Sequence, residues 1–393
     1  MSSKTRVCPY CFELFDVSDV KFRCGNPSCS KSKDEALSNF WQLDHIESPV
    51  APAKKKFLGG VPELGVCPEC HREAYQVICP HCHNRLPSNM VKDGGFIVSI
   101  VGARSSGKTN YITVLINELL RNGYRLGNIG TIPSSVSDTP QNSTTNRYKN
   151  DFYEFVYGRS ECPPQTATDD PKSKVPLIYE LTQKGTNSAH LVFYDTAGEN
   201  FNSPEEIENN ARFLKNSDAV IYLLDTFNIE QVHQRLQQPM NLGNIELPYD
   251  FILNNIIGFF DNRTSKQDRE AFYKKPIALT FSKIDAILNN TDLFDNYSIP
   301  GMSMNQNSPY MSGSSVLNSD FDGINEGLRQ AMAMWGEGTF LNNIDNRFKN
   351  AHFFGISALG EAPEKATQIS NLQPYRVLDP LVWILLQLKY QFK

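Results

Sequence analysis

Short apolar runs recur along the chain beyond residue 94, and polar or amphipathic stretches separate them. Six of these runs are rich in β-branched or aromatic residues and predict buried strands. They span residues 96–101, 175–181, 190–195, 219–225, 276–282 and 351–356. The run at 175–181 is expected to be of the edge type, and the others to lie inside a sheet.

Helical periodicity occupies several of the intervals between these strands. Residues 110–121 repeat leucine and isoleucine at helical spacing, and Gly123 follows them. A helical insert is expected at about 226–274, since this stretch is longer than one crossover needs, and an amphipathic helix begins at about Asp379. Residues 291–319 are rich in Asn, Ser, Met and Gly and are expected to form a flexible insert.

Composition narrows the class of protein. The chain has 393 residues, enough for two or three domains. Its net charge of −5 does not indicate nucleic-acid binding, although a local basic patch leaves it possible. No apolar run approaches the ~20 residues of a membrane span, and the amino terminus has no signal-peptide pattern. Eight of the nine cysteines fall in close pairs, as in cytosolic metal proteins, so we expect a cytoplasmic protein.

The paired cysteines predict two Zn²⁺ sites. A C-x2-C turn directs two thiolates at one metal, and a second pair completes a tetrahedral site. One zinc-binding module is expected in residues 1–30 and a zinc ribbon in 67–90, where two C-P-x-C turns give the strongest metal signal, with 31–66 as a connector. The expected zinc ligands are Cys8, Cys11, Cys24, Cys29, Cys67, Cys70, Cys79 and Cys82.

Two pairings of these cysteines are open. In the tandem arrangement, which is simpler and which we favour, each set of four holds its own metal. In the cross-braced arrangement, the first pair joins the third and the second joins the fourth. In both cases the sites are expected to be mainly structural, because segments this small cannot hold a core alone.

Residues 102–109 read GARSSGKT and match the phosphate-binding loop G-x-x-x-x-G-K-[ST]. The strand before it and the helix after it aim backbone N–H groups and a positive helix dipole at a phosphate. Lys108 is expected to neutralise the β- and γ-phosphates, and the Thr109 hydroxyl to hold Mg²⁺. The expected nucleotide contacts in this stretch are Gly102, Ala103, Ser105, Ser106, Gly107, Lys108, Thr109 and Asn110.

A second phosphate-sensing element follows the strand at 190–195. Asp195 at its tip is suited to holding Mg²⁺ through water, and the Gly198 N–H to bonding the γ-phosphate. Residues 122–174 form a long polar passage of the kind in which a triphosphate-sensing switch lies. Thr166 and Thr168 are its candidate γ-phosphate threonines, and Thr131 is a weaker alternative.

Two further strand ends carry groups suited to guanine. Ser282, Lys283 and Asp285 follow the fifth strand. The Asp285 carboxylate can accept from both the ring N–H and the exocyclic amine of guanine, a pair that adenine lacks, while the Lys283 stem would lie over the base. Ser357, Ala358 and Leu359 follow the sixth strand, where a backbone N–H could bond the guanine carbonyl oxygen.

These four elements in this order, GARSSGKT, DTAG, SKID and SAL, resemble a translation-factor/Ras-type (TRAFAC) GTPase over residues 94–393. The resemblance implies an α/β fold, a doubly wound, mostly parallel six-stranded sheet with nucleotide at the carboxyl ends of its strands. It implies GTP/GDP and Mg²⁺ as cofactors. The cysteine pairs ahead of this domain resemble a bacterial group of zinc-ribbon TRAFAC GTPases associated with conflict or defence systems.

The chain departs from the Ras-type pattern at three positions. Glu199 stands where a glutamine usually orients the attacking water. Arg104 occupies a loop position that is small in Ras and could act as a built-in arginine finger; it could equally point to solvent or pair with a carboxylate. Ser282 replaces the usual Asn or Thr, a mild change. The expected catalytic residues are Lys108, Gly198, Glu199, Arg104, Thr166 and Thr168.

Three functions remain open. The first is a slow Mg²⁺-dependent GTPase switch whose zinc ribbons dock a protein partner. The second is a scaffold that holds nucleotide without hydrolysing it and binds protein or nucleic acid through the ribbons. The third is an ATPase that uses the same phosphate loop.

Overall fold

The computed structural model describes residues 5–54, 60–137, 139–164, 175–184, 188–195, 197–210, 213–245, 247–294, 299–311, 315–363 and 367–392. The chain forms two compact units. Unit 1 comprises Met1–Ile97, Ile132–Arg147 and Asp170–Val192, and unit 2 comprises Val98–Thr131, Tyr148–Asp169 and Phe193–Lys393. Among the described residues, no helix is both long enough and apolar enough to cross a membrane.

A seven-stranded sheet carries the α/β part of the chain. Its strand order is β11 (Gly130–Pro133), β12 (Leu177–Thr182), β13 (Ala189–Phe193), β10 (Gly95–Gly102), β14 (Ala219–Asp225), β15 (Ile277–Ser282) and β16 (Ala351–Gly355). Strand β10 pairs in parallel with β13 and β14, and the ladders β14–β15 and β15–β16 are also parallel. The predicted mostly parallel α/β sheet is confirmed.

All six predicted strands are present, and β11 is an addition to them. Strand β11 is a short segment, Gly-Thr-Ile-Pro, inside a polar passage, so hydrophobic periodicity gave no sign of it. The expectation that residues 175–181 form an edge-type strand is wrong, because β11 lies beyond β12 in the sheet.

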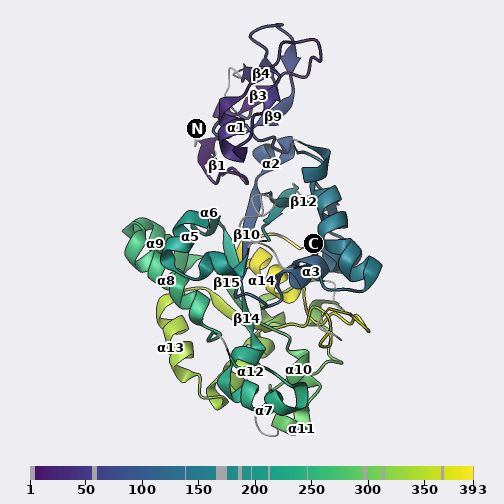
Figure 1. Cartoon of the computed structure of the whole chain (residues 1–393), viewed down its shortest axis with the longest axis vertical. Coiled ribbons are helices and arrows are strands. Elements are labelled where there is room, and N and C mark those ends of the chain that lie inside the picture. Colours follow the sequence, from purple (N-terminus) through teal and green to yellow (C-terminus); the bar gives the residue numbers. More distant parts are fainter. Residues whose placement is uncertain are drawn as a thin grey trace. The chain divides into compact units, whose positions relative to one another are not determined.

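Helices flank the strands on both sides in unit 2. Figure 1 shows α8 (Phe251–Arg263), α9 (Lys266–Lys274) and α13 (Gly338–Arg347) on one side, with α3 (Lys108–Asn122) and α14 (Asp379–Gln387) on the other. The remaining α-helices after residue 100 are α4 (Thr144–Arg147), α5 (Pro204–Asn210), α6 (Phe213–Asn216), α7 (Glu230–Met240), α10 (Asp285–Leu288), α11 (Thr291–Phe294) and α12 (Asp322–Met334).

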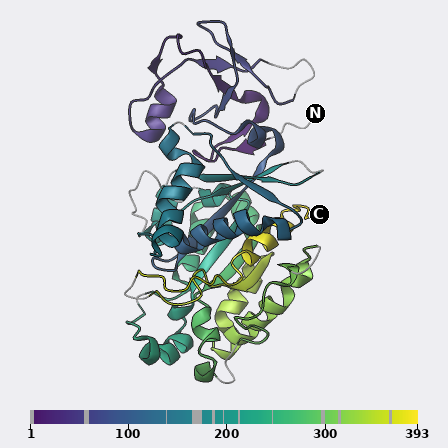
Figure 2. The same ribbon diagram turned by 90° about the vertical axis from the view of Figure 1, so that its right-hand side faces the viewer.

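Helix α3 begins directly at the phosphate loop and carries its apolar stripe into the core. Ile112, Leu115, Ile116 and Leu119 are all buried, as their helical spacing predicts. Figure 2 shows α3 (dark blue) running beside α14 (yellow), as Figure 1 does from the front. The core therefore fixes the direction in which the first turn of α3 points.

Both stretches expected to be inserts contain helices or buried residues. The helices expected at 226–274 are present as α7, α8 and α9. Within 291–319, Ile299 and Tyr310 are buried, so the described part of this stretch contributes to the core and is not simply a surface insert. Residues Tyr148–Arg159 form a π-helix that packs on α3.

The cysteine-rich segment, residues 5–93 of unit 1, is built from short elements. Its strands are β1 (Thr5–Val7), β2 (Leu14–Asp16), β3 (Lys21–Arg23), β4 (Ser32–Lys33), β5 (Ile46–Glu47), β6 (Val50–Pro52), β7 (Gly65–Val66), β8 (Glu73–Ala74) and β9 (Gln76–Ile78), and its helices α1 (Glu35–Trp41) and α2 (Ser88–Asp93). Strand β3 pairs with β6 on one side and β9 on the other.

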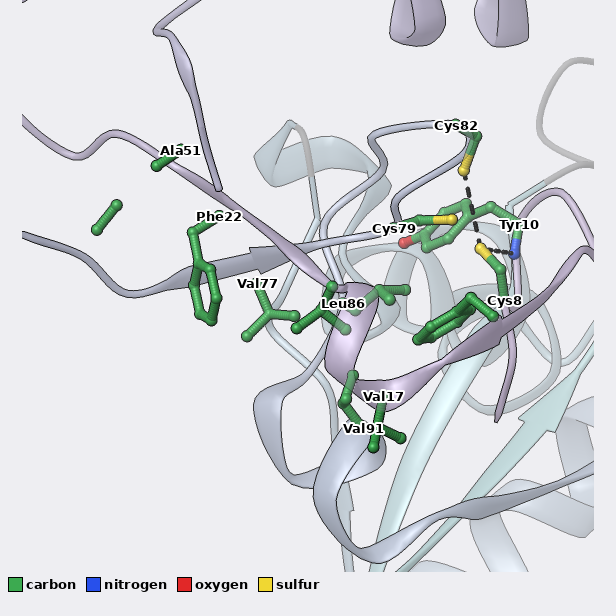
Figure 3. Close-up of a cluster of buried hydrophobic side chains, with 13 residues drawn as sticks. Cys8, Tyr10, Val17, Phe22, Ala51, Val77, Cys79, Cys82, Leu86 and Val91 are labelled. Carbon is green, nitrogen blue, oxygen red and sulfur yellow. Dashed lines mark hydrogen bonds between the residues drawn. The ribbon is translucent and has the colours of Figure 1, made fainter. Parts of the chain in front are cut away.

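This central three-stranded sheet joins regions that the sequence separated. Phe22 of β3 lies opposite Ala51 of β6 and Val77 of β9, and all three are buried in one cluster (Figure 3). The prediction that residues 31–66 are only a connector is therefore wrong, since β6 is part of the same small core.

Candidate nucleotide site and cysteine clusters

The phosphate loop lies between the end of β10 and the start of α3. Ser105 and Gly107 adopt left-handed conformations, with φ of 63° and 87°. Glycine adopts such a φ without strain, so Gly107 lets the chain turn directly into the first helical residue, Lys108. This tight path leaves the N-terminal N–H groups of α3 facing the loop, as an anion site requires.

Lys108 is held inside the loop. Its Nζ donates to the carbonyl oxygens of Gly102 and Ala103, each at 2.8 Å, and the side chain is only 7% exposed. Burial lowers its pKa to about 8, although the nearby carboxylates of Asp195 and Glu199 oppose this shift. A phosphate in the loop would supply the negative charge that this buried ammonium needs.

Thr109 and Asp195 face each other across the expected magnesium position. The Thr109 Oγ1 lies 3.3 and 3.4 Å from the two carboxylate oxygens of Asp195. Hydroxyl and carboxylate oxygens are the ligands that Mg²⁺ prefers, together with waters and substrate phosphates. Thr109 and Asp195 therefore have the chemistry and the proximity to hold Mg²⁺, which would neutralise phosphate charge there.

Gly198 approaches the phosphate loop too closely to carry a side chain. A Cβ at this position would lie 2.4 Å from the backbone N of Arg104 and 2.7 Å from the carbonyl carbon of Ala103. The backbone of the DTAG element thus packs directly on the backbone of the phosphate loop. This contact is what a γ-phosphate sensor at Gly198 would need.

The two unusual residues of the site form an ion pair. The Arg104 Nε lies 3.5 Å from a Glu199 carboxylate oxygen, with the two side chains 65% and 33% exposed. The Arg104 side chain thus pairs with a carboxylate while staying largely exposed, and its role as an arginine finger stays a prediction. Glu199, the residue in place of the water-orienting glutamine, is its partner.

At the expected base end, Lys283 is held by Asp225, a residue at the end of β14. The Lys283 Nζ donates to Asp225 Oδ2 at 2.6 Å and lies 4.9 Å from the centre of the Phe227 ring. Asp225 also caps the next turn, accepting from the Phe227 N–H at 3.1 Å. Lys283, with φ of 58°, is thereby fixed over an aromatic ring.

Asp285 is buried at the start of α10. It is 6% exposed, and burial raises its pKa, opposed mainly by a hydrogen bond from the Ser357 side chain. The Ser357 Oγ also accepts the Gly360 N–H at 2.8 Å, which closes the loop that contains Ala358 and Leu359. The carboxylate and the loop expected to recognise guanine are therefore linked to each other.

One cavity of about 470 Å³ collects these groups. It is lined by fifteen of the predicted site residues: Arg104, Ser105, Ser106, Gly107, Lys108, Thr109, Asn110, Gly198, Glu199, Ser282, Lys283, Asp285, Ser357, Ala358 and Leu359. Gly102, Ala103 and Asp195 lie directly behind this lining, through their contacts with Lys108 and Thr109. The sequence-predicted site is thus brought together in one place.

The cavity has further walls that the motifs did not indicate. Phe227 and the segment Cys162–Pro164 also line it. Cys162 accepts a hydrogen bond from Asn110 Nδ2 at 3.5 Å, and its own N–H donates to Thr367 at 2.8 Å. The one sequence signal for Phe227 is its position, since it is an aromatic residue just after the end of β14.

The candidate switch threonines, Thr166 and Thr168, lie outside the described residues. Thr131, the alternative, lies on β11 and is not among the residues that line the cavity.

The eight paired cysteines form two four-sulfur clusters. Cluster A contains Cys8, Cys11, Cys79 and Cys82, and cluster B contains Cys24, Cys29, Cys67 and Cys70. Measured sulfur–sulfur distances are 3.7 and 3.8 Å in cluster A and 3.6 and 3.8 Å in cluster B. A tetrahedral zinc with Zn–S bonds of ~2.3 Å places its sulfurs ~3.8 Å apart, so both clusters fit zinc.

The pairing of the cysteines differs from both arrangements considered. The first pair joins the fourth, and the second joins the third, so cluster B is nested inside cluster A along the sequence. The favoured tandem pairing is wrong, and so is the division into separate modules at 1–30 and 67–90. The reason is the β3–β6–β9 sheet, whose paired strands come from both halves of the segment and hold these halves side by side.

The clusters also differ in their surroundings. Cys8, Cys79 and Cys82 belong to the buried apolar cluster around Tyr10, Phe15 and Phe22, whereas no cysteine of cluster B does. In Figure 3 the Cys8 and Cys82 sulfurs face each other beside Tyr10. Cluster A is therefore part of the core of the cysteine-rich segment.

Comparison with known proteins agrees with the site. The family described as "Double-GTPase 2" matches residues 96–295, half of the chain, from the strand before the phosphate loop to beyond Asp285. The chain belongs to the double-GTPase 2 family. With the two cysteine clusters, this match confirms the predicted resemblance to a P-loop GTPase domain with amino-terminal zinc sites.

Individual relatives are more distant. This double-GTPase chain is 25% identical over 321 residues to a protein of Mycolicibacterium smegmatis described as "Putative ESX-1 scaffolding and assembly protein SaeC", and the match covers 78% of each chain. It is also similar to the GTP-bound GTPase-like domain of Saccharomyces cerevisiae Ski7, with a TM-score of 0.34 and 10% identity. That match covers 76% of this chain and about half, 51%, of the Ski7 chain.

Another similar structure is the signal recognition particle receptor SRb-GTP/SRX complex of Chaetomium thermophilum. Its TM-score is 0.26 at 15% identity, covering 68% of this chain and 95% of that chain.

Proposed function

We propose that this chain binds GTP with Mg²⁺ and hydrolyses it slowly to GDP and phosphate, as a molecular switch. The observation that carries this proposal is the layout of the main cavity. Lys108 and Thr109 lie at a phosphate-binding loop, and the buried Asp285 lies in the same cavity beside the loop of Ser357. A guanine nucleotide has phosphates, which the phosphate loop would bind, and a guanine base, which Asp285 would bind.

Each residue has a defined part in this proposal. Lys108 and the N–H groups of the loop would hold the β- and γ-phosphates, and Thr109 and Asp195 would hold Mg²⁺, which neutralises charge as the γ-phosphate leaves. Gly198 would sense the γ-phosphate. Glu199 would orient the attacking water only when it is released from Arg104.

The cysteine-rich segment would dock a protein partner. The similar mycobacterial protein is described as a scaffolding and assembly protein, which supports a protein partner here. The proposed location of the protein is the cytoplasm. One proposed role of the switch is in a bacterial conflict or defence system. Nucleic acid stays a weaker partner, since the chain has a net charge of −5.

A scaffold without hydrolysis is the second candidate function. The Arg104–Glu199 pair favours it, because the pair occupies both side chains that could assist the attacking water. The description of the similar mycobacterial protein favours it as well.

The experiment that tests the proposal is single-turnover hydrolysis of GTP and ATP by zinc-replete protein with Mg²⁺, together with binding of GDP and ADP. Guanine-selective binding with hydrolysis that Lys108→Ala abolishes is the expected result. Guanine-selective binding without any hydrolysis would support the scaffold. Equal binding of GDP and ADP would refute the role given to Asp285 and favour an ATPase.

A further inference from the structure

The segment that follows Asp195 is attached to helix α8 as well as to the phosphate loop. Residues Gly198–Phe201 form a 3₁₀ helix, and α5 follows it and packs along α8 (Figure 1). Helix α8 belongs to the helical stretch expected at 226–274, which is longer than one crossover needs. The 3₁₀ helix that contains Glu199 is thus supported by an element that the nucleotide-binding motifs did not indicate.

Asn255 of α8 makes a specific polar contact with this segment. Its Nδ2 donates to the carbonyl oxygens of Phe201, at 3.0 Å, and Asn202, at 2.8 Å. A side-chain amide nitrogen carries two hydrogens, so these two bonds use both. The last carbonyls of a helix have no partner inside the helix. Asn255 therefore completes the end of the 3₁₀ helix from a different element.

A short path of hydrogen bonds leads from Asn255 to Glu199. The peptide unit between Phe201 and Asn202 has its carbonyl on Asn255, and its N–H donates to the Glu199 carbonyl at 3.1 Å. At the other end of the 3₁₀ helix, Gly198 packs directly on the backbone of the phosphate loop. The backbone of Glu199 is therefore held from both sides.

Helix α8 is itself firmly placed. The Leu253 N–H donates at 3.0 Å to the hydroxyl group of Tyr222, which is buried on β14. Phe260, near the other end of α8, stacks on Phe272 of α9 with ring centres 3.8 Å apart. Asn255 lies between these two anchor points, so its donors are presented from a fixed position.

Ion pairs form a second kind of contact between α5 and α8. Arg263 pairs with Glu205 and, at 3.0 Å, with Glu208. The side chains of Arg263, Glu205 and Glu208 are 36%, 59% and 53% exposed, and exposed ion pairs contribute little. The bonds of Asn255 to the backbone are therefore the contact expected to set the position of the segment.

We propose that Asn255 is a positioning residue for GTP hydrolysis, which holds the backbone of Gly198 and Glu199 where they meet the γ-phosphate and the attacking water. The described lining of the nucleotide cavity does not include Asn255, so it acts through residues 199–202. The effect on hydrolysis rests on the proposed function, whereas the effect on the position of the segment does not.

The position of the segment is tested by hydrogen exchange of the amides of residues 198–202, in full-length, zinc-replete protein without nucleotide. Asn255→Ala removes both donors and should speed this exchange severalfold. Asn255→Gln keeps both donors on a longer side chain and should restore part of the protection. The matched control is Asn254→Ala, because Asn254 is exposed on the same helix and donates to Asp250 Oδ2 at 2.9 Å. Equal exchange in Asn255→Ala and Asn254→Ala would overturn the proposal.

The effect on hydrolysis is tested by single-turnover reaction at saturating GTP. Asn255→Ala should be slower by about 10- to 100-fold, since a misplacement of ~1 Å can cost that much in rate. GDP affinity should stay unchanged, and affinity for a non-hydrolysable GTP analogue should fall severalfold, because Gly198 is expected to contact the γ-phosphate alone. Asn254→Ala and Arg263→Gln should keep the wild-type rate. An equal loss of GDP and analogue affinity would show a merely structural role and refute positioning.

Failure of the proposed function gives a different result. If wild-type protein hydrolyses no GTP, the hydrolysis assay fails for every variant, but the ratio of analogue affinity to GDP affinity still tests Asn255. A ratio that Asn255→Ala leaves unchanged would overturn the positioning role even where hydrogen exchange is faster.

Discussion

The Sγ atom of Cys8 lies 3.7 Å from the Sγ atom of Cys82, although 74 residues separate the two cysteines along the chain. This contact joins the two ends of the cysteine-rich segment in one structure, rather than in two independent ribbons. The binding free energy of a structural zinc is about 10–16 kcal/mol and is coupled to folding, so a zinc ion in either cluster would stabilise the folded segment.

The nested pairing makes a prediction about zinc stoichiometry. Wild-type protein should hold two zinc ions, and Cys8→Ser, Cys82→Ser and Cys70→Ser should each hold one. The double variant Cys8→Ser/Cys82→Ser should still hold one, since both ligands belong to cluster A. The control, Cys8→Ser/Cys70→Ser, should hold none. Tandem pairing requires that Cys8→Ser/Cys82→Ser also loses both ions, and a colorimetric zinc assay distinguishes the outcomes.

Nucleotide affinity should depend on pH through Lys108. Below its pKa of about 8 the free protein already carries the ammonium, so GDP binds without proton uptake. Above pH 8 the free lysine is neutral, and binding must recharge it. The Kd of GDP should therefore rise by up to about tenfold per pH unit between pH 8 and the higher pKa of the bound state.

A matched control exists for this titration. Lys275 is also buried with a pKa of about 8, but it bonds the carbonyls of Leu214 and Lys215 and does not line the cavity. Lys275→Met should keep the pH dependence, whereas Lys108→Arg should flatten it because arginine stays charged. A flat profile in the wild type would contradict the role of Lys108.

Breaking the Arg104–Glu199 pair should change the hydrolysis rate. Glu199→Gln restores the neutral water-orienting group and releases the guanidinium, so single-turnover hydrolysis of GTP should accelerate by about tenfold or more. The full effect of an engaged arginine finger is ~10³–10⁵, and the double variant Glu199→Gln/Arg104→Ala should lose the gain. A slower Glu199→Gln enzyme would instead show that the carboxylate is needed.

Gly198→Ala should damage the site by contact alone. The added Cβ would lie 2.4 Å from the backbone N of Arg104, and relief of such crowding typically costs about 1–3 kcal/mol. Binding of a GTP analogue should weaken by roughly five- to 150-fold. The control is Gly243→Ala, where a Cβ meets nothing within 4 Å. Equal affinity of the two variants would show that Gly198 can move away from the loop.

Asp285→Asn should exchange guanine preference for xanthine preference. An amide cannot accept from both guanine donors, and hydrogen bonds to charged groups contribute ~1.5–3 kcal/mol, so GDP affinity should fall by about 10- to 100-fold. Asp225→Asn is the comparison, because it loosens Lys283 without touching the base contact. It should weaken GDP and XDP alike. Unchanged base preference in Asp285→Asn would remove Asp285 from guanine recognition.

Local features of the site were predictable because each lies in one short stretch. The glycine loop, the strand before it and the helix after it occupy residues 95–122 and follow from apolar periodicity and a fixed motif. Asp195, Lys283 and Asp285 follow strand ends in the same way. Parallel strands bring such ends to one edge of a sheet, so the cavity could be anticipated without coordinates.

Contacts between distant segments were not predictable. The cysteine spacings identify the ligands, but they carry no information on which pair meets which. The β3–β6–β9 sheet decides that, and its strands are only three residues long. The ion pair of Asp225 with Lys283 joins the ends of two strands, and the two residues are 58 positions apart in the sequence. The wall formed by Cys162–Pro164 depends on backbone bonds to residues near 367.

The nested pairing also sets the order in which the two clusters become complete during synthesis on the ribosome. Cluster B has all its ligands once residue 70 has been made, whereas cluster A needs Cys82. Twelve residues separate these events, a delay on the order of a second at normal rates of synthesis. A zinc ion that bound cluster B at once would leave Cys8 and Cys11 as free thiols during that delay. The earliest cysteines are thus the last to be protected from oxidation.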